Sequence, residues 1–194
     1  NGISGVRFLP HMKEMGFAGH VGAMPADLDE LSREYFSEAD LLAMSEPMIL
    51  AGIAGQDCYE DAGFQVRTDN EEADWDTGAI MGTGSSGLET ACSKLIPRVE
   101  QKKIRRLGST MVEQTMCSSV SAKLGGILGL GGQVTTNSSA CTTGTESIVD
   151  AFHKVKFGLS KRILAGGTEG ASVYVWAGFD AMKVTCRKFN NHPS

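Results

Sequence analysis

Cys141 is the residue of this sequence best placed for nucleophilic chemistry. It stands between residues 133–137, a β-branched stretch that predicts a strand, and an apolar repeat that predicts a helix. The repeat recurs every third or fourth position, as one helical face does, at Ile148, Phe152, Val155 and Leu159. Cys141 is therefore predicted to lie on the turn between a buried strand and a helix.

The position of Cys141 at a helix N-terminus would activate its sulfur. Thr143 and Glu146 have the spacing of a capping box, which predicts that the helix begins near Thr143. Unpaired backbone N–H groups and the positive end of the helix dipole favour an anion there, and the thiolate is the nucleophilic form of cysteine. The alternative is a small buried thiol at a strand edge, and spacing alone does not decide between the two.

Three stretches, found in the family's order, carry a resemblance to the β-ketoacyl-acyl carrier protein synthases. These are the condensing enzymes of fatty acid and type II polyketide synthesis. The stretches are Ile-Met-Gly-Thr-Gly-Ser-Ser-Gly-Leu at 80–88, Ser-Ser-Ala-Cys-Thr-Thr-Gly-Thr at 138–145 with Gly-Gly-Thr-Glu at 166–169, and Phe-Asp-Ala-Met at 179–182 with Lys-Phe-Asn at 188–190.

The resemblance spans nearly the whole chain and implies an α/β fold. The family has a thiolase-like, layered α-β-α architecture, of which this chain would be the N-terminal half with a mixed sheet and buried helices. Residues 1–194 are accordingly interpreted as one N-terminal ketosynthase domain, truncated at both ends. The acidic stretch 69–76 is predicted to be a solvated surface loop.

The reaction that the resemblance implies has two halves. The Cys141 thiolate accepts an acyl group from acyl carrier protein, and decarboxylative condensation with malonyl-carrier protein then gives a β-ketoacyl product. The family uses two histidines of its C-terminal half for the second step, and the histidines of this chain lie outside such motifs: His11, His20, His153 and His192. This chain alone is expected at most to acylate itself. No resident cofactor or metal is expected, because the phosphopantetheine arm arrives on the carrier protein.

The resemblance also implies an acyl pocket and a docking site. Ser85 and Phe179 match residues that line the acyl pocket of the family. The basic residues Lys102, Lys103, Arg105 and Arg106 are concentrated in an otherwise acidic chain, in a region where the family docks its carrier protein. A solvated turn is the alternative interpretation of this basic cluster. The resemblance further implies pairing through strand 133–137 into a homodimer, or a heterodimer with a related ketosynthase.

Other functions remain as alternatives. The chain could be a non-catalytic dimerisation or binding fragment, since it lacks the histidine motifs. It could also be a partner subunit, although such subunits usually lack the cysteine that is present here. An NADP-dependent oxidoreductase is suggested by Gly-Thr-Gly-Ser-Ser-Gly at 82–87, which has the G-x-G-x-x-G form. That fingerprint requires a second strand soon afterwards, and residues 98–107 are too charged for a central strand.

Bulk properties narrow the setting. A net charge of −5 argues against nucleic-acid binding, which needs a basic surface. No apolar run reaches the length of a membrane span. Five cysteines, an odd number without any C-x-x-C pair, argue against zinc knuckles and fit a reducing compartment. The prediction is a cytoplasmic protein.

Overall fold

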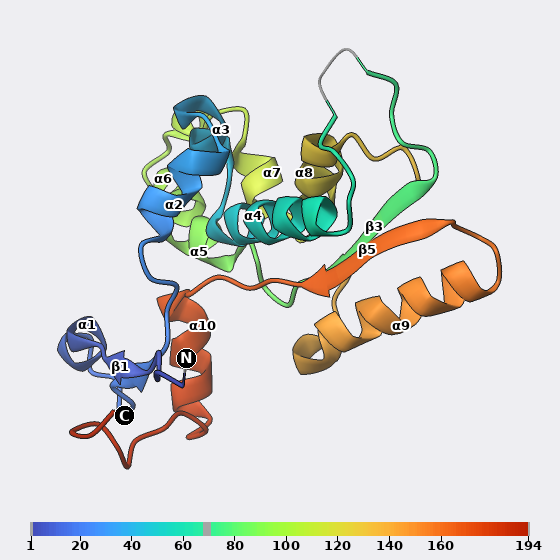
Figure 1. Ribbon diagram of the computed structural model, residues 1–194. Coiled ribbons are helices and arrows are strands. Elements are labelled where there is room, and N and C mark those ends of the chain that lie inside the picture. Colours follow the sequence, from blue (N-terminus) through green and yellow to red (C-terminus); the bar gives the residue numbers. More distant parts are fainter. Residues whose placement is uncertain (1, 68–70, 194) are drawn as a thin grey trace. The chain divides into compact units, whose positions relative to one another are not determined.

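Three parallel strands form the sheet on which the site is built (Figure 1). In the computed structural model, which describes residues 2–67 and 71–193, β3 (Thr77–Gly82) lies between β4 (Val134–Asn137) and β5 (Arg162–Gly167). Every residue of β3 is buried, as expected for the central strand of a parallel sheet. The register pairs Gly82 with both Asn137 and Gly167, so the three strands end together at one edge.

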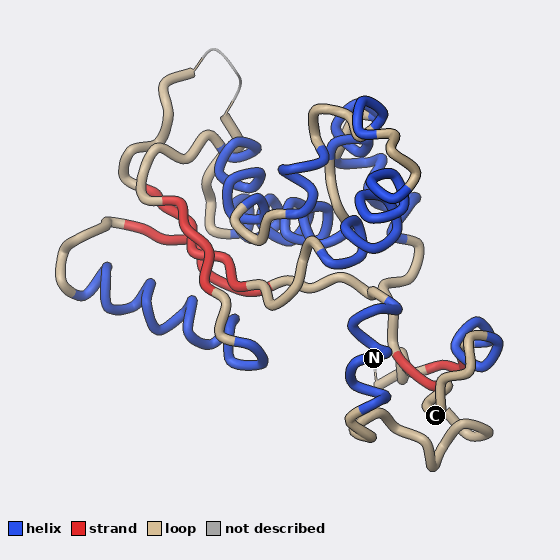
Figure 2. Tube along the Cα trace, turned by 180° about the vertical axis from the view of Figure 1, so that it is seen from behind, coloured by secondary structure: helices blue, strands red, loops and turns tan. Residues whose placement is uncertain are grey.

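Helices cover both faces of this sheet. On one face α9 (Thr143–Lys156) packs against β3 and β5, and on the other α8 (Ser119–Leu128) packs against β3 and β4, with α4 (Glu46–Asp61) against α8 (Figures 1 and 2). The predicted α-β-α layering is confirmed. All three strands of this sheet run parallel, and the antiparallel pairing among the described residues belongs to a separate two-stranded ribbon.

The buried layer between α4, α8 and the sheet is tightly packed. A Cβ on Gly55 would stand 2.3 Å from Leu124 Cδ1, so the two helices approach closely because Gly55 has no side chain. α8 ends at Gly129, whose φ of 64° supplies the left-handed C-terminal conformation that favours glycine. The largest fully buried side chains of this layer are Met48, Ile80, Leu124, Leu128 and Val120.

Short helices precede and follow the central strand. α3 (Glu38–Ala43) begins after Ser37, whose hydroxyl accepts a hydrogen bond from the Asp40 N–H at 3.2 Å. The segment after β3 forms five short helical elements: α5 (Leu88–Thr90), the π-helical turn η1 (Ala91–Leu95), α6 (Ile96–Glu100), the 3₁₀ turn η2 (Ile104–Arg106) and α7 (Met111–Thr115). Pro97 has no N–H to donate to the preceding turn, which fits the wider π-helical turn before it.

Residues 1–31 and 171–194 form a separate compact unit, whereas residues 32–170 form the unit just described. The smaller unit contains β1 (Arg7–Phe8) paired antiparallel with β2 (Val21–Gly22), α1 (Pro10–Glu14) and α10 (Val173–Ala181), and α2 (Leu28–Tyr35) contains the boundary between the units. Asp180 accepts hydrogen bonds from the N–H groups of Ala18 and Gly19 at 2.9 and 3.1 Å. The N-terminal loop is thereby tied to the end of α10.

The expectation that the acidic stretch 69–76 is solvated is wrong for Asp74. Residues 69 and 70 lie outside the described part of the chain, but Asp74 is buried. Its carboxylate accepts hydrogen bonds from Thr77 Oγ1 at 2.6 Å and from Tyr59 Oη at 3.1 Å, and it pairs with Arg162 at 3.2 Å. These partners compensate the cost of burying the charge.

Candidate functional site

The candidate site is the edge of the sheet where β3, β4 and β5 all end. The loop after β3 carries Ser85, the turn after β4 carries Cys141, and the loop after β5 carries Glu169. In open parallel sheets covered by helices, ligands bind outside the carboxyl ends of the strands. The topology thus gathers three loops, separated along the chain, at the location where an α/β protein binds its ligand.

Cys141 lies on the predicted turn. It occupies the 3₁₀ turn η3 (Ala140–Thr142), which leads directly into α9 at Thr143, and it is exposed. Ala140 has a φ of 51°, in the left-handed region that residues with a side chain rarely adopt. Such strained residues cluster at functional sites. The geometry leaves the sulfur accessible beside a helix N-terminus.

A set of side-chain hydrogen bonds holds this turn. The Ser139 N–H donates to Thr143 Oγ1 at 3.0 Å, and the Thr143 hydroxyl donates to the Ala140 carbonyl. The Ser139 hydroxyl donates to Asn137 Oδ1 at 2.7 Å, which links the turn to the end of β4. Every one of these groups lies within four residues of Cys141, so local sequence builds the turn.

The capping box predicted for Thr143 and Glu146 is wrong. Thr142 is the N-cap of α9, and Thr143 is the first residue of the helix. Because the Thr143 hydroxyl is used within the turn, it does not cap the helix. Glu146 instead lies 3.5 Å from the Thr142 hydroxyl. The predicted start of the helix is nevertheless confirmed.

Glycines seat α9 on the sheet close to Cys141. A Cβ on Gly167 would stand 3.0 Å from the Cα of Gly144, in the first turn of α9. Close approach of the two backbones therefore requires glycine at the end of β5. The Gly-Gly pair at 166–167, which belongs to one of the stretches that carry the resemblance, lies where the helix that follows Cys141 meets the strand.

Ser85 lies at the same edge as Cys141, whereas Phe179 does not belong to that unit. The Ser85 N–H donates to the Glu169 carboxylate, at 3.1 Å to Oε2. Phe179 lies on α10 and lines a cavity of about 320 Å³, mostly apolar, in the unit of residues 1–31 and 171–194. Its lining includes Phe17, Val21, Trp176, Val184 and Cys186. The acyl-pocket roles of Ser85 and Phe179 stay predictions.

The four basic residues of the predicted docking site are all exposed. Lys102 has a φ of 57°. Arg105 and Arg106 lie in η2, which begins at the exposed Ile104, directly after Lys103. None of the salt bridges found in the described part of the chain involves these four residues.

The loop at 82–87 lacks what a dinucleotide site requires. It follows a strand and precedes a helix, as the fingerprint demands, but residues 98–107 form the end of α6 and the turn η2 instead of a strand. The N–H groups of Gly84 and Ser85 already donate to Glu169. The same donors are thus not free for a pyrophosphate, and the geometry does not support the NADP alternative.

Two histidines have described partners of their own. His153 packs beside Phe152 and Phe157, with ring centroids 5.6 and 6.1 Å away. In the smaller unit, His20 Nε2 donates to the Phe17 carbonyl oxygen, 2.8 Å away. Among the described residues, no three His, Cys, Asp or Glu side chains gather as metal ligands would.

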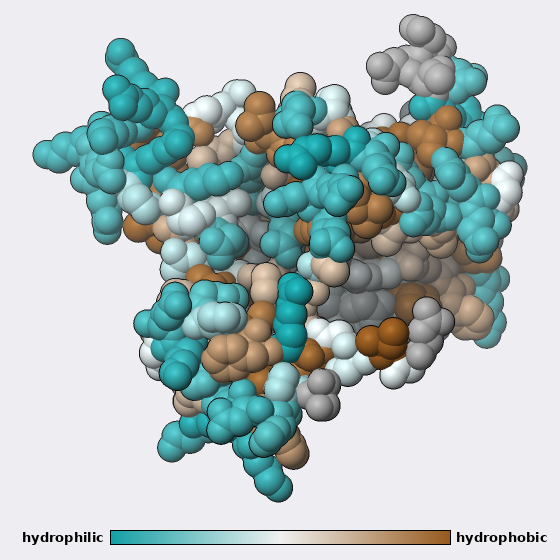
Figure 3. Space-filling model, turned by 60° about the vertical axis from the view of Figure 1, so that its left-hand side comes forward, coloured by the Kyte–Doolittle hydropathy of each residue, from teal (hydrophilic) through white to brown (hydrophobic). Residues whose placement is uncertain are grey.

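Two further cavities lie in the larger unit. One, of about 670 Å³, is mostly apolar and runs between α9 and β5, with Ile148, Phe152 and Val155 among its lining. The predicted apolar face of α9 is therefore partly exposed, with Ile148 and Phe152 each 57% accessible. Hydrophobic residues, in brown, also reach the surface between hydrophilic ones, in teal, on the face drawn in Figure 3.

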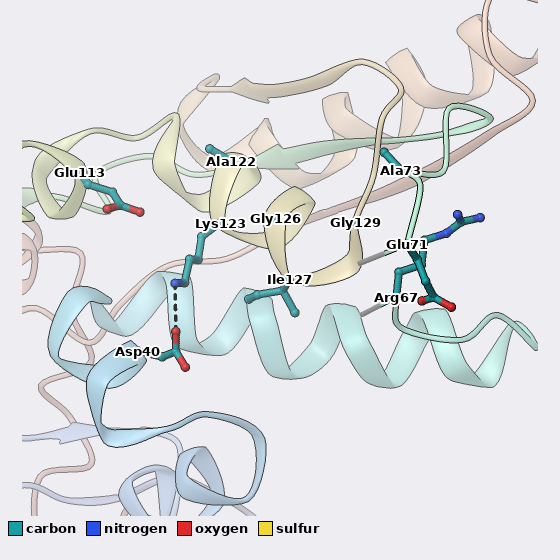
Figure 4. A pocket seen from close by; sticks show the side chains of 10 residues that line it. All are labelled: Asp40, Arg67, Glu71, Ala73, Glu113, Ala122, Lys123, Gly126, Ile127 and Gly129. Carbon is teal, nitrogen blue, oxygen red and sulfur yellow. Dashed lines mark ion pairs between the residues drawn. The ribbon is translucent and has the colours of Figure 1, made fainter. Parts of the chain in front are cut away.

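The other cavity is charged and contains no predicted site residue (Figure 4). Lys123 of α8 and Asp40 of α3 form an ion pair of 3.6 Å across it. Its volume is about 550 Å³, and its lining also includes Arg67, Glu71 and Glu113.

Sequence reasoning did not single out Glu169, whose carboxylate accepts hydrogen bonds from the loop after β3. The motif Gly-Gly-Thr-Glu was noted, but no role was given to its acid. The signal available in the sequence is that this acid directly follows the Gly-Gly-Thr of the stretch 166–169, which carries part of the resemblance.

Comparison with known proteins gives a consistent answer. The family described as "Beta-ketoacyl synthase, N-terminal domain" matches residues 12–194. The 3-oxoacyl-[acyl-carrier-protein] synthase 2 of Vibrio harveyi is 30% identical over 197 residues, which cover 99% of this chain and 45% of that protein. The chain thus spans slightly less than half the length of the curated relatives that it matches.

Solved structures share the fold. A β-ketoacyl synthase from Burkholderia phymatum STM815 aligns with a TM-score of 0.79 at 23% identity, over 99% of this chain and 46% of that one. The complex AntDE:AntF, a type II polyketide ketosynthase with its acyl-carrier protein, aligns with a TM-score of 0.69 at 16% identity, over 78% and 43%. In the described part of the chain, no helix is both long and apolar enough to cross a membrane.

Proposed function

Because this chain belongs to the β-ketoacyl synthase family, we propose that it is the N-terminal portion of a condensing enzyme that extends an acyl chain in fatty acid or polyketide synthesis. The observation that carries the proposal is the exposed Cys141 on the strand-to-helix turn. A nucleophilic cysteine in that position has access to a substrate and lies near the N-terminus of α9, where the helix dipole favours a thiolate.

In the first half-reaction the Cys141 sulfur attacks the carbonyl carbon of a carrier-bound acyl thioester. A new carbon–sulfur bond forms to Cys141, and the bond to the phosphopantetheine sulfur breaks. That sulfur leaves as a thiolate and takes up a proton. The backbone N–H of Cys141 is proposed as one donor to the oxyanion that develops on the carbonyl oxygen. The product is an acyl group held on the enzyme as a thioester.

The second half-reaction requires groups outside this chain. Malonyl-carrier protein loses carbon dioxide, and the resulting enolate carbon attacks the acyl carbon on Cys141 to release a β-ketoacyl-carrier product. The two histidines that the family uses are proposed to come from the remainder of the protein, since the histidines of this chain lie outside the family's histidine motifs. The partly exposed apolar face of α9 supports this view, because large apolar patches mark surfaces that another part covers.

Acyl carrier protein is the proposed partner, and the basic residues at 102–106 are its proposed docking site. Their exposure and their lack of salt bridges in the described residues support this role. Carrier proteins are acidic, so the charges would raise the association rate and select the partner. No resident cofactor is needed in this scheme, since the phosphopantetheine arm is part of the substrate.

A dimer built on β4 is also proposed. β4 is an edge strand of the described sheet, so one side of its backbone is available for pairing with a second copy or with a related ketosynthase. All five cysteines are free thiols, which supports the cytoplasm as the compartment.

The test of this function is a condensation assay with the full-length protein. Supplied with acyl-carrier and malonyl-carrier protein, it should release carbon dioxide and form a β-ketoacyl-carrier product, and Cys141→Ala should abolish product formation. A full-length protein that binds the carrier but makes no product would instead be a partner subunit or a binding protein.

A further inference from the structure

Glu169 makes a set of contacts that the condensing reaction itself does not explain. Its Oε2 accepts a hydrogen bond from the Gly84 N–H at 2.8 Å and another from the Ser85 N–H at 3.1 Å. Its Oε1 lies 3.3 Å from the Ser85 nitrogen and 3.4 Å from Thr83 Oγ1. One carboxylate therefore binds three consecutive residues of the loop after β3.

In the described structure, the polar interactions of the Glu169 side chain are confined to this loop. None of the salt bridges there involves it, and its hydrogen bonds all go to residues 83–85. Because hydrogen bonds to a charged acceptor are stronger than neutral ones, this residue is the main polar tie on the loop. Ser86 adds none, since its hydroxyl is buried and has no hydrogen-bond partner among the described residues.

Backbone contacts anchor both ends of this tie. The Thr83 N–H donates to the Asn137 carbonyl at 3.1 Å, and the Thr168 N–H donates to the Gly82 carbonyl at 2.9 Å. Thr168 also donates from its hydroxyl to the Pro47 carbonyl at 3.2 Å. Glu169 is thus held in place by the ladder between β3 and β5, and its carboxylate is the group that reaches over to the loop.

Glycine at position 84 fits this arrangement. A Cβ on Gly84 would stand 2.9 Å from Glu169 Oε2, closer than side-chain carbons approach a neighbouring atom. Any side chain there would push the carboxylate away from the two N–H groups. The two positions are therefore coupled, although 85 residues separate them in the sequence.

We propose that Glu169 is a positioning residue that fixes the loop 83–86 and thereby sets which acyl chains the site accepts. The inference rests on the proposed function and on the prediction that Ser85 lines the acyl pocket. When the carboxylate holds the loop, Ser85 keeps a fixed position in the acyl pocket and limits the length of acyl chain that fits. When the loop is released, the pocket can adapt to acyl chains of different lengths. Glu169 does not touch the reacting atoms in this scheme.

The test uses the full-length protein with Glu169→Gln. Glutamine keeps one acceptor oxygen and replaces the other by an NH₂ group, which cannot accept a hydrogen bond from a backbone N–H. Some of the hydrogen bonds from the Gly84 and Ser85 N–H groups are therefore lost. Two quantities are measured: hydrogen exchange at the Gly84 and Ser85 amides, and kcat/KM for acylation of Cys141 by short, medium and long acyl-pantetheine thioesters. Glu60→Gln on α4, an exposed glutamate without a role in the site, is the matched control.

The expected result is faster exchange at both amides and a flatter chain-length profile. Relative kcat/KM between the best and the worst acyl chain should change about fivefold, chiefly through KM, with iodoacetamide labelling of Cys141 changed by less than about twofold. Gly84→Ala should give the same flattened profile. The double variant with Glu169→Gln should differ little from either single variant, because both substitutions disrupt the same contact between the loop and the carboxylate. Glu169→Asp, which keeps the charge on a shorter arm, should recover part of the selectivity.

Two results would overturn the inference. Unchanged exchange at Gly84 and Ser85 in Glu169→Gln would show that the carboxylate does not hold the loop. Faster exchange with an unaltered acyl profile would show that the loop does not select the acyl chain. Failure of the wild-type protein to be acylated by any thioester would overturn the proposed function, and this inference with it. Normal acylation with an unmoved profile would overturn the inference alone.

Discussion

Gly82 and Thr143 are so close that no side chain fits between them. A Cβ built on Gly82 would stand 2.3 Å from Thr143 Cγ2 and 2.6 Å from the Thr143 carbonyl oxygen. Gly82 is the last residue of β3, and Thr143 is the first residue of α9, two residues after Cys141. The position of the cysteine turn is therefore set by direct contact between strand and helix.

Gly82→Ala should disturb Cys141 through this contact. Because backbone atoms cannot yield as a flexible side chain does, we expect a loss of about 1–3 kcal/mol in the free energy of unfolding and slower acylation of Cys141. Gly126→Ala, in the middle of α8, is the matched control, since its Cβ would meet nothing within 4 Å. Denaturant unfolding and iodoacetamide labelling measure both effects. Equal behaviour of the two variants would contradict the prediction.

Asp74→Asn should destabilise the larger unit. The buried carboxylate accepts hydrogen bonds from Thr77 and Tyr59 and pairs with Arg162. In asparagine an amide N–H₂ group, itself a donor, would face these donors, and the charge that pairs with Arg162 would be lost. We expect a loss of about 2 kcal/mol in the free energy of unfolding, read from chemical denaturation. Asp76→Asn removes only the exposed pair with Lys161 and should cost less than about 0.5 kcal/mol. A loss at Asp74 as small as that at Asp76 would refute the role of the network.

Asp180 should titrate at unusually low pH. Hydrogen bonds from the Ala18 N–H, the Thr185 hydroxyl and the Gly19 N–H lower the pKa of this carboxyl from 3.8 to about 2. Because the folded-state pKa lies below the unfolded one, the stabilisation is full above about pH 4 and is lost as the pH falls towards 2. Carbon-13 NMR of the Asp180 carboxyl measures the midpoint. A midpoint near 4 would mean that the carboxyl does not hold the loop at 18–19.

Charge reversal in the basic cluster should weaken carrier binding. The double variant Lys102→Glu and Arg105→Glu should bind acyl carrier protein about tenfold more weakly at low salt, with a difference that shrinks as salt screens the charges. The double variant Lys13→Glu and Lys183→Glu, which reverses two exposed lysines of the other unit, controls for the change in net charge. Calorimetric titration at two ionic strengths provides the measurement. Equal affinity of the double variant and the wild type would remove the docking site.

The sequence was sufficient to predict the turn that carries Cys141. A β-branched stretch, a run of small residues and an apolar helical repeat follow one another within about thirty residues, and each element forms largely from local preferences. The capping-box prediction was wrong because two consecutive threonines, Thr142 and Thr143, could each have taken the N-cap position. Thr142 takes the N-cap position, and Thr143 bonds back to the turn.

The contacts that were not predicted are long-range. Glu169 meets Gly84 across 85 residues, and Arg162 meets Asp74 across 88, because β5 pairs with β3. The register of two parallel strands is not encoded in the local composition of either one. For the same reason an acidic stretch suggested solvent at Asp74, whereas its compensating cation arrives from a distant strand.

The central claim is that Cys141 carries the acyl group, and intact-mass spectrometry of the full-length protein tests it most directly. After incubation with an acyl-carrier thioester, the mass should rise by one acyl group, peptide mapping should place it on Cys141, and Cys141→Ala should show no adduct. An adduct mapped to Cys92 or Cys117, or one that persists in Cys141→Ala, would contradict the account.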